Sequence, residues 1–274
     1  MQGTDATAAH QRQDVAETRV IVEVESKSHP VHEEEFARGL QLQFVVFRQE
    51  RAGRARAASL LRGWDGRASP DSRAAALFYV WVERLRARAA ASLYGRAGGW
   101  FPLDALVRVF EQGAFPWDAH GAAALDSAAA LALAEADSLV AGRRWGELHR
   151  VMARHALGSA RPLERLLRLD VGPAPHGGSP TTVNVAHHEG GLPPYTTVVG
   201  PSQRHVVDLG DLDGGGGFVL PTGQSGIPFS PHYRDQFGRW RSGGLWRVPL
   251  DRERARARTV HRLRLVPAEG GGRG

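Results

Sequence analysis

Apolar and polar positions repeat with a helical period between residues 52 and 160, a segment rich in Ala, Leu and Arg. The run Ser69-Pro70-Asp71 has the residue types that favour a helix start: a serine cap, a proline in the first turn and an acidic group near the positive helix end. The pattern then predicts a helix with one apolar face, formed by Ala74, Leu77, Phe78, Trp81 and Leu85, and with Arg73 and Arg84 on the other face.

Three further helices are predicted downstream. One begins near Pro102 and stops at Gly113, with Leu103, Leu106, Val107 and Phe110 inward. The alanine-rich stretch 122–140 is helical by propensity. In the next helix one stripe holds Trp145, Leu148, His149, Met152 and His155. We interpret the two histidines as partly buried and hydrogen-bonded rather than as metal ligands or catalytic groups, because no carboxylate or thiol stands at ligand spacing.

The composition changes after residue 170, where Gly, Pro, Thr and Val rise and the helical period ends. Short apolar runs between turn residues predict strands at 181–185, 204–208, 217–220 and 261–265, and two earlier ones at 20–24 and 44–47. Helices followed by strands indicate an α+β fold. We divide the chain into an N-terminal segment (1–50), a helical part (51–170) and a strand- and loop-rich part (171–274).

Composition excludes several classes of protein. The 274 residues contain no cysteine, which excludes disulfides, zinc–thiolate sites, iron–sulfur clusters and a thiol nucleophile. No run of 18 apolar residues is present, so no transmembrane helix is predicted. The start Met1-Gln2-Gly3-Thr4-Asp5 lacks the features of an export signal, so the chain as written is expected to be cytoplasmic.

The charge is basic but unevenly spread. The net charge is +6, made up of −4 in residues 1–50 and +10 in the remainder, and Lys27 is the only lysine. The arginines are scattered beside acidic residues in helical segments, whereas a nucleic-acid interface clusters its cations and interleaves aromatics. The densest run is Arg252, Arg254, Arg256 and Arg258. The pattern therefore argues against nucleic acid as a partner.

Several short motifs only partly fit known sites. In Gly223-Gln224-Ser225-Gly226, position 227 is Ile where the serine-hydrolase elbow requires glycine, which favours a tight turn. Asp211-Leu212-Asp213-Gly214 lacks the further oxygen ligands and the closing glutamate of a calcium loop, which favours a flexible turn. The glycines 214–217 lack the continuation of a phosphate loop.

Two histidine motifs leave a structural and a functional reading open. His187-His188 lies at a predicted strand end, where neighbours point to opposite faces, so joint binding of one metal is disfavoured. His232-Tyr233 with Asp235 could hold an acid–base histidine, or could pin a loop through hydrogen bonds, and the second reading is favoured.

A recognisable series of residue blocks nevertheless runs along the chain. The most specific block runs from Gly223 to Gln236 and is followed by Trp240 and Gly244. The others, in chain order, are Leu60 to Gly66 with Trp64-Asp65-Gly66, Asp71-Ser72 through Phe78 and Trp81, Trp145-Gly146 with His149 and His155, Gly177-Gly178 with Thr182-Val183-Asn184, and Gly200 to Asp208. Together these blocks resemble the C-terminal end of the large chain of the penicillin acylase (penicillin amidase) family. The resemblance covers about residues 52–267 and leaves residues 1–50 unmatched.

The resemblance implies an N-terminal-nucleophile hydrolase with a four-layer αββα sandwich. In such enzymes a serine freed by self-cleavage attacks an amide carbonyl, and its own α-amino group is the base. Backbone N–H groups and an asparagine stabilise the oxyanion, and water releases the acid from the acyl-enzyme. Members are typically periplasmic or secreted and often bind calcium through upstream residues, so no cofactor is expected here.

The residues that would carry this chemistry fall upstream of the matched blocks. Ser26 and Ser28 lack the expected context for the nucleophile, and Asn184, the only asparagine, does not correspond to the oxyanion residue. We therefore assign no catalytic, cofactor-binding or metal-binding residue. The chain is expected to be a truncated or split form of an N-acyl amide hydrolase, inactive unless a partner supplies the missing N-terminal half or the alpha chain.

The alternative is a non-catalytic basic binding module that reuses the same scaffold. A piece of a large sandwich should also expose apolar surface, for which Trp64, Trp81, Trp100 and Trp117 are the candidates.

Overall fold

The chain forms two compact units, each described here by itself. A computed structural model describes residues 55–95, 99–214, 216–260 and 263. The larger unit comprises Glu23–Arg204 and Val219–Gly244, and the smaller comprises Met1–Val22, His205–Phe218 and Leu245–Gly274. The strands predicted at 20–24 and 44–47 lie outside the described residues, as does that at 261–265 apart from Leu263.

Helix α5 (Arg73–Tyr94) is the centre of the larger unit. Its N-cap is Ser72, whose hydroxyl accepts the N–H of Ala75 at 3.0 Å, and it ends at Gly95 with φ +57°. The predicted start at Ser69 is therefore three residues early. Ser69 and Asp71 form a turn before the helix instead, in which the Ser72 N–H donates to the Ser69 carbonyl.

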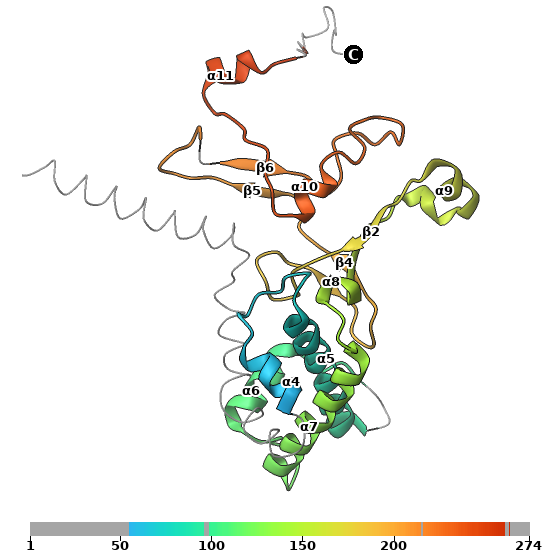
Figure 1. Cartoon of the computed structure of the whole chain (residues 1–274), viewed down its shortest axis with the longest axis vertical. Coiled ribbons are helices and arrows are strands. Elements are labelled where there is room, and N and C mark those ends of the chain that lie inside the picture. The colour runs from blue at the N-terminus through green and yellow to red at the C-terminus, as the bar shows by residue number, and fades with distance from the viewer. Residues whose placement is uncertain (1–54, 96–98, 215, 261–262, 264–274) are drawn as a thin grey trace, which may run out of the picture. The chain divides into compact units, whose positions relative to one another are not determined.

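The predicted apolar face of α5 is confirmed but is only part of its buried surface. All five predicted residues are buried: Ala74, Leu77, Phe78, Trp81 and Leu85. The remaining residues between positions 75 and 83 are buried as well. The predicted outer residues Arg73 and Arg84 are exposed and half-buried, respectively. The helix is enclosed on several sides because α4 (Ala55–Arg62), α6 (Leu103–Gln112), α7 (Gly121–Val140) and α8 (Trp145–Leu148) all contact it (Figure 1).

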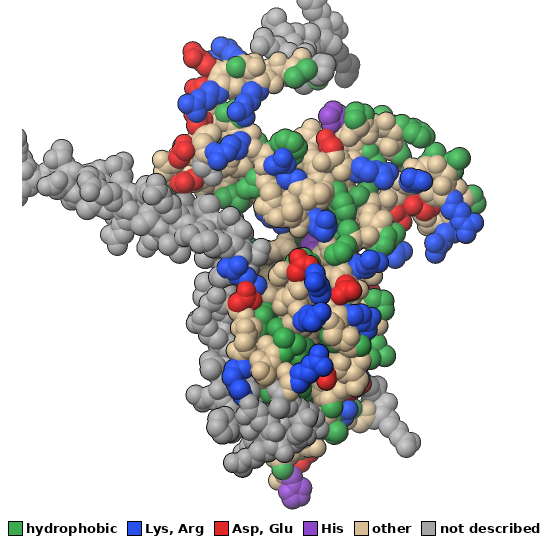
Figure 2. All heavy atoms as spheres, in the orientation of Figure 1, with side chains coloured by type: hydrophobic (Ala, Val, Ile, Leu, Met, Phe, Trp, Pro, Cys, Tyr) green, Lys and Arg blue, Asp and Glu red, His purple; other side chains and the backbone are tan. Residues whose placement is uncertain are grey.

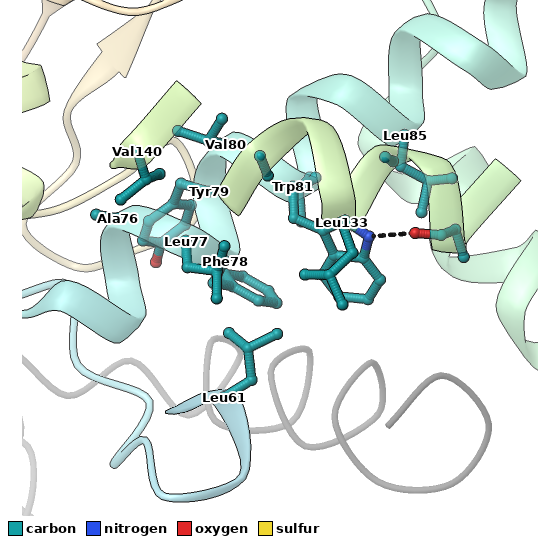
Figure 3. Packing of buried hydrophobic residues seen from close by; sticks show 14 of the residues in the cluster. Leu61, Ala76, Leu77, Phe78, Tyr79, Val80, Trp81, Leu85, Leu133 and Val140 are labelled. Carbon is teal, nitrogen blue, oxygen red and sulfur yellow. Dashed lines mark hydrogen bonds between the residues drawn. The ribbon is translucent and has the colours of Figure 1, made fainter. Parts of the chain in front are cut away.

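The core between α5 and α7 is built from large side chains. Trp81 is 1% exposed, and its indole N–H donates to the carbonyl of Ala129 on α7 at 3.1 Å. Figure 3 shows this bond, with Leu133 and Val140 of α7 and Leu61 of α4 packed around the residues of α5. The helices predicted at 102–113 and 122–140 are confirmed, and Gly113 ends the first of them at φ +68°.

The helix predicted through His155 is wrong beyond Leu148. Helix α8 has four residues, after which the chain becomes strand β1 (His149–Ala153). The strand is favoured because β1 pairs with two neighbours, antiparallel to β2 (Val171–Pro175) and parallel to β4 (Tyr195–Val199), so long-range pairing outweighs helical propensity.

The four-stranded sheet has the order β2-β1-β4-β3, with the short β3 (His187–His188) antiparallel to β4. Between β1 and β2 the chain forms the 3₁₀ turn η2 (Ala156–Ser159) and helix α9 (Arg161–Leu167), neither of which has a buried residue. In Figure 1, α9 stands at the tip of this excursion. The larger unit also contains α10 (Phe237–Arg241).

The strand predicted at 181–185 is wrong, because this segment forms turns. The hydroxyl of Thr182 accepts the N–H of Ser179 at 2.8 Å and approaches the carbonyl of Asn184 at 2.8 Å. Side-chain bonds of this kind hold the backbone in turns and replace the ladder bonds of a strand.

A second sheet pairs β5 (Arg204–Val206) with β6 (Gly217–Val219). The strands predicted at 204–208 and 217–220 are thus confirmed apart from their ends. In the smaller unit Phe218 forms a bridge with Trp246, and α11 (Arg252–Ala257) contains most of the arginine run. The helices and mixed sheets confirm the α+β class. In the part of the chain that the structure describes, no helix combines the length and apolar character needed to cross a bilayer.

Candidate functional site

Trp145 is the residue around which the first turn of α5, α8 and the sheet come together. It is fully buried, and its indole N–H donates to the carbonyl of Gly178 at 2.9 Å. Its backbone N–H donates to the carbonyl of Ser72, the cap of α5, at 2.9 Å. Gly146 approaches Pro70 so closely that an added Cβ would lie 2.8 Å from the proline Cβ, which leaves room only for glycine.

His149 stacks on this tryptophan and is held by two hydrogen bonds. The rings lie 4.5 Å apart at 8°. Nδ1 lies 3.0 Å from the carbonyl oxygen of His176, and because a carbonyl only accepts, Nδ1 carries the proton. Nε2 lies 3.2 Å from the hydroxyl of Thr197 and accepts from it in the neutral ring. The predicted interpretation of His149 as a buried, hydrogen-bonded histidine agrees with this geometry.

His176 and His188 complete what we call the histidine cluster (His149, His176 and His188). Their rings lie 5.9 Å and 5.3 Å from that of His149. His176 is 1% exposed, and neither of its ring nitrogens has a hydrogen-bond partner among the described residues. The buried nitrogens of His188 have no side-chain partner there, and the backbone of Ala186 is the polar group that acts on this ring. The sequence analysis did not single out His176, which stands outside every helical or alternating pattern.

Burial keeps the cluster uncharged. Desolvation lowers the pKa of His149 to about 4, against the smaller opposing effect of its bond to the His176 carbonyl. Desolvation, reinforced by the neighbouring His149, lowers the pKa of His176 to about 3 and that of His188 to about 3. All three rings are therefore neutral at pH 7.

A buried ion pair lies on α5, near Tyr195 of β4. Glu83 and Arg86 are each 9% exposed, and Arg86 Nη1 lies 2.7 Å from Glu83 Oε1. Arg86 Nε also donates to the carbonyl of Phe101 at 2.8 Å, and the guanidinium lies 4.8 Å from the ring centre of Trp100. Burial, with Glu83 adding to it, raises the pKa of Tyr195. The pair is thus part of the packing between α5 and β4.

This arrangement contains one pairing of hydroxyl and base, Thr197 with His149. Thr197 is 6% exposed and His149 is fully buried, so an amide substrate does not reach the hydroxyl in this structure. The partner of His149 Nδ1 is the carbonyl of His176, which orients the ring but supplies no negative charge to stabilise an imidazolium. The geometry therefore describes a structural hydrogen bond.

The segment from Gly223 to Gln236, here the QSG-to-DQ loop, is closed by bonds among its own residues. The hydroxyl of Ser225 accepts the N–H of Ile227 at 3.1 Å, and the Ser225 N–H donates to the carbonyl of His232. Nδ1 of His232 lies 2.8 Å from Asp235 Oδ2, on an exposed surface. Ser225 thus forms the tight turn that was favoured, and the contact of His232 with Asp235 is the loop-pinning bond.

The loop is also fixed to the rest of the larger unit. The hydroxyl of Tyr233 donates to the carbonyl of Leu169, and Arg234 donates to the carbonyl of Arg168 at 2.6 Å. The side-chain oxygen of Gln236 accepts the N–H of Leu220 at 2.9 Å. These bonds attach the C-terminal end of the loop to neighbouring segments.

The two aspartates of the calcium-like motif bind backbone groups of the smaller unit. Asp211 accepts the N–H of Gly214 at 2.9 Å, and Asp213 accepts those of Leu250 and Asp251 at 2.9 and 2.6 Å. Within the described ranges, no group of three or more His, Cys, Asp or Glu side chains is placed to hold a metal ion.

The remaining predicted residues lie apart from the histidine cluster or at its edge. His155 caps η2, its Nδ1 accepting the N–H of Leu157 at 3.1 Å. His187 is exposed while His188 packs on Tyr195 at 4.4 Å, so the pair does point to opposite sides. Asn184 accepts from Arg204 at 2.7 Å and has a structural contact. Ser26 and Ser28 lie outside the described residues.

The tryptophans expected on the exposed surface are mostly inside. Trp64 and Trp81 are buried, and Trp117 is half-buried, because α4, α6 and α7 complete their own core around α5. Trp100 is 67% exposed, as expected. Large apolar side chains are instead exposed elsewhere, among them Leu166 of α9 and Phe229 of the QSG-to-DQ loop, each 77% exposed.

The sequence blocks, far apart along the chain, contact one another in the structure. Trp145 binds the carbonyl of Gly178, and the Gly178 N–H donates to the carbonyl of Ala68 beside the Trp64 block. Arg204 binds both Asn184 and the carbonyl of Trp240, each at 2.7 Å, and Trp240 lies 5.1 Å from the ring of His176. The blocks thus form one connected framework.

Several known acylases are similar to this chain. Penicillin acylase 2 proenzyme from a Pseudomonas species is 34% identical over 143 residues, which are 52% of this chain and 18% of that protein. Acyl-homoserine lactone acylase QuiP of Pseudomonas putida is 28% identical over 235 residues, covering 76% of this chain and 28% of its own length. The protein of the same name from Pseudomonas syringae pv. tomato is 32% identical over 148 residues, 51% of this chain and 17% of the relative.

The chain therefore spans between 17% and 28% of the length of these relatives. A family model described as Penicillin amidase matches residues 6–257. The matched range takes in most of the segment 1–50, which the sequence blocks had left unmatched. With its blocks joined in one framework and nearly its whole length matched, the chain belongs to the penicillin amidase family.

Proposed function

We propose that this chain is the C-terminal, framework-forming part of a penicillin-acylase-type amidohydrolase that cleaves a linear N-acyl amide through an acyl-enzyme. Its nucleophile, the serine with a free α-amino group, comes from outside the described residues. The chain alone is catalytically silent, and it becomes part of an active enzyme when the remaining part of the fold is present.

The observation that carries this proposal is the mutual contact of the family blocks. Side chains of the blocks bind other blocks or the segments beside them. Trp145 binds the carbonyl of Gly178, Arg204 binds Asn184 and the carbonyl of Trp240, and Gln236 accepts the N–H of Leu220. A set of residues kept for catalysis would leave a base or a hydroxyl free in an accessible cleft. These groups instead fix strand ends and turns, which is the role of a framework that supports a site built elsewhere.

The arginines support a framework role over a binding surface. Arg84 and Arg88 both contact Glu135 of α7, at 2.9 and 3.2 Å, and Arg241 donates to the carbonyl of Pro175 at 3.1 Å. Figure 2 shows Arg side chains interspersed with acidic ones over the helical part. Cations used within the fold offer less attraction to a nucleic-acid backbone.

The relatives' names support a class of substrate. They are named as a penicillin acylase and as acyl-homoserine lactone acylases, all of which remove an acyl group from an amide nitrogen. We therefore propose small N-acyl amides as the substrates of the assembled enzyme. We place the acyl pocket outside the described residues, so the assay should compare several acyl groups.

A chimera tests the proposal. In the Pseudomonas putida relative, the part that matches this chain is exchanged for the corresponding residues of this chain, and acyl-homoserine lactone hydrolysis is measured. We expect the chimera to mature and to release the acyl acid, while this chain alone does not. A chimera that matures but shows no hydrolysis would contradict the proposal, as would turnover by the chain alone.

The matched control is the same chimera with Trp145→Ala, which removes the indole bond to Gly178 and the stack on His149. This variant should lose maturation or stability. A second control, Leu131→Ala on the exposed side of α7, should behave like the unmodified chimera.

A further inference from the structure

The histidine cluster links three segments that are separate along the chain. His149 begins β1, His176 follows β2 directly, and His188 ends β3. His149 also stacks on Trp145 of α8, and His176 packs edge-on against Trp240 of α10 at 5.1 Å. A change at these three rings therefore acts on the sheet, α8 and α10 together.

The surroundings of the cluster accept only neutral rings. The charged groups that act on it are cationic: Arg86 of α5 on His188, and Arg204 and Arg241 on His176. His187, the neighbour of His188 on β3, acts in the same direction. Glu83 of α5, the carboxylate beside Arg86, is paired with it at 2.7 Å. Tyr195 of β4 packs on His188 and stays uncharged because burial raises its pKa.

The ring nitrogens have few partners with which to stabilise a proton. Those of His176 have none among the described residues, and His188 has only the backbone of Ala186 acting on it. His149 has the carbonyl of His176, the hydroxyl of Thr197 and the backbone of Ala186. An imidazolium needs an acceptor at both nitrogens, so a proton on any of the rings leaves an unpaired buried charge beside two other rings.

We propose that the histidine cluster is an acid-sensitive switch, which holds the four-stranded sheet against α8 and α10 while all three rings are neutral and releases it when the solution becomes acidic. This inference does not depend on the proposed function, because it concerns contacts within the larger unit alone.

The direction of the pH effect follows from the lowered pKa values. In the unfolded chain a histidine binds its proton near pH 6.5, whereas the three folded rings do so near 4 or 3. Below pH 6.5 the unfolded state therefore binds more protons, and the folded state loses stability as the pH falls. Each ring lowers the ratio of folded to unfolded chain by up to about tenfold per pH unit in this window.

Urea unfolding of the full chain, followed by tryptophan fluorescence at pH 8, 7, 6 and 5, tests the switch. We expect the stability of the unmodified chain to fall steeply between pH 6 and pH 5. The double variant His176→Leu and His188→Leu removes two titrating rings, and the contact of His188 with the Ala186 backbone is the one hydrogen bond described here that it affects. It should retain far more of its stability at pH 5. The control is His120→Gln, at an exposed position before α7, which should keep the full pH dependence.

A second measurement keeps the test sharp if the double variant does not fold. Histidine ring NMR shifts of the unmodified folded chain should show three rings that stay neutral down to about pH 5. The inference is overturned if the His149, His176 and His188 rings take up protons near pH 6.5 in the folded chain. It is also overturned if the folded double variant and the unmodified chain show the same pH dependence.

Discussion

At the scale of single residues, close backbone approaches carry much of the framework. Gly178 has φ +80°, its carbonyl accepts from Trp145, and an added Cβ would collide with the carbonyl oxygen of Asn184. The positive φ and the close approach to Asn184 each require glycine. The position lies in the Gly177-Gly178 block, so the block is explained by geometry and needs no ligand.

Replacing Gly178 with alanine should therefore lower the free energy of unfolding by more than the cost of positive φ alone. That cost is about 1–2 kcal/mol, and the collision adds to it. Gly243→Ala is the matched control, because Gly243 also has φ +80° but nothing lies within 4 Å of an added Cβ. Urea unfolding of both variants measures the difference, and equal losses would show that the approach to Asn184 is not tight.

The buried pair of Glu83 and Arg86 gives a second prediction at this scale. Glu83→Ala leaves the guanidinium of Arg86 buried without its carboxylate, and we expect a loss of about 3–5 kcal/mol in unfolding free energy. Asp71→Ala serves as the control, because its ion pair with Arg144 is exposed and should contribute little. Thermal or urea unfolding distinguishes the two, and a small loss for Glu83→Ala would mean that solvent reaches Arg86.

At the scale of secondary-structure elements, α5 and α7 form the main packing contact of the larger unit. Leu133 is 1% exposed and faces α5, whereas Leu131, two residues earlier on the same helix, is 48% exposed. Leu133→Ala should cost about 2–5 kcal/mol of unfolding free energy, through lost burial and the cavity left behind. Leu131→Ala should change it little, and equal effects in urea unfolding would contradict the packing described here.

The long helices could be predicted from the sequence alone, but the four-stranded sheet could not. In α5 and α7 the apolar period and propensity act in the same direction as the tertiary contacts, so the predicted elements match. At His149 they conflict: the local pattern continues a helix, while pairing with β2 and β4, made by residues far along the chain, favours a strand. The turn at 181–185 was missed because the β-branched residues of this segment favour a strand by propensity. The bond from the Ser179 N–H to the Thr182 hydroxyl, which holds the turn, leaves no mark in the sequence pattern.

The candidate site divides in the same way, into residues that local spacing predicts and residues that only long-range packing brings together. The structural reading of Ser225, His232 and Asp235 followed from the missing glycine at position 227 and from local spacing, and the bonds within the loop agree with it. The histidine cluster could not be predicted, because His149, His176 and His188 are brought together only by strand pairing and by the packing of α8. His176 in particular has no local signal.

At the scale of the whole molecule, the exposed apolar side chains support our proposal that this chain works as part of a larger fold. Leu166, Phe229, Ile227 and Leu157 are all more than half exposed, and they come from η2, α9 and the QSG-to-DQ loop. We expect the isolated chain to bind a hydrophobic dye and to have low solubility. A soluble monomer that binds no dye and melts in one sharp step would contradict this expectation.

The central claim is that this chain holds the framework of an acyl transfer site and not its nucleophile. Intact-mass spectrometry of the purified chain, incubated with a chromogenic phenylacetyl or fatty-acyl anilide, tests it directly. The account predicts an unchanged mass and no release of the aniline. An acyl adduct on a serine or threonine of this chain, formed together with released aniline, would contradict it.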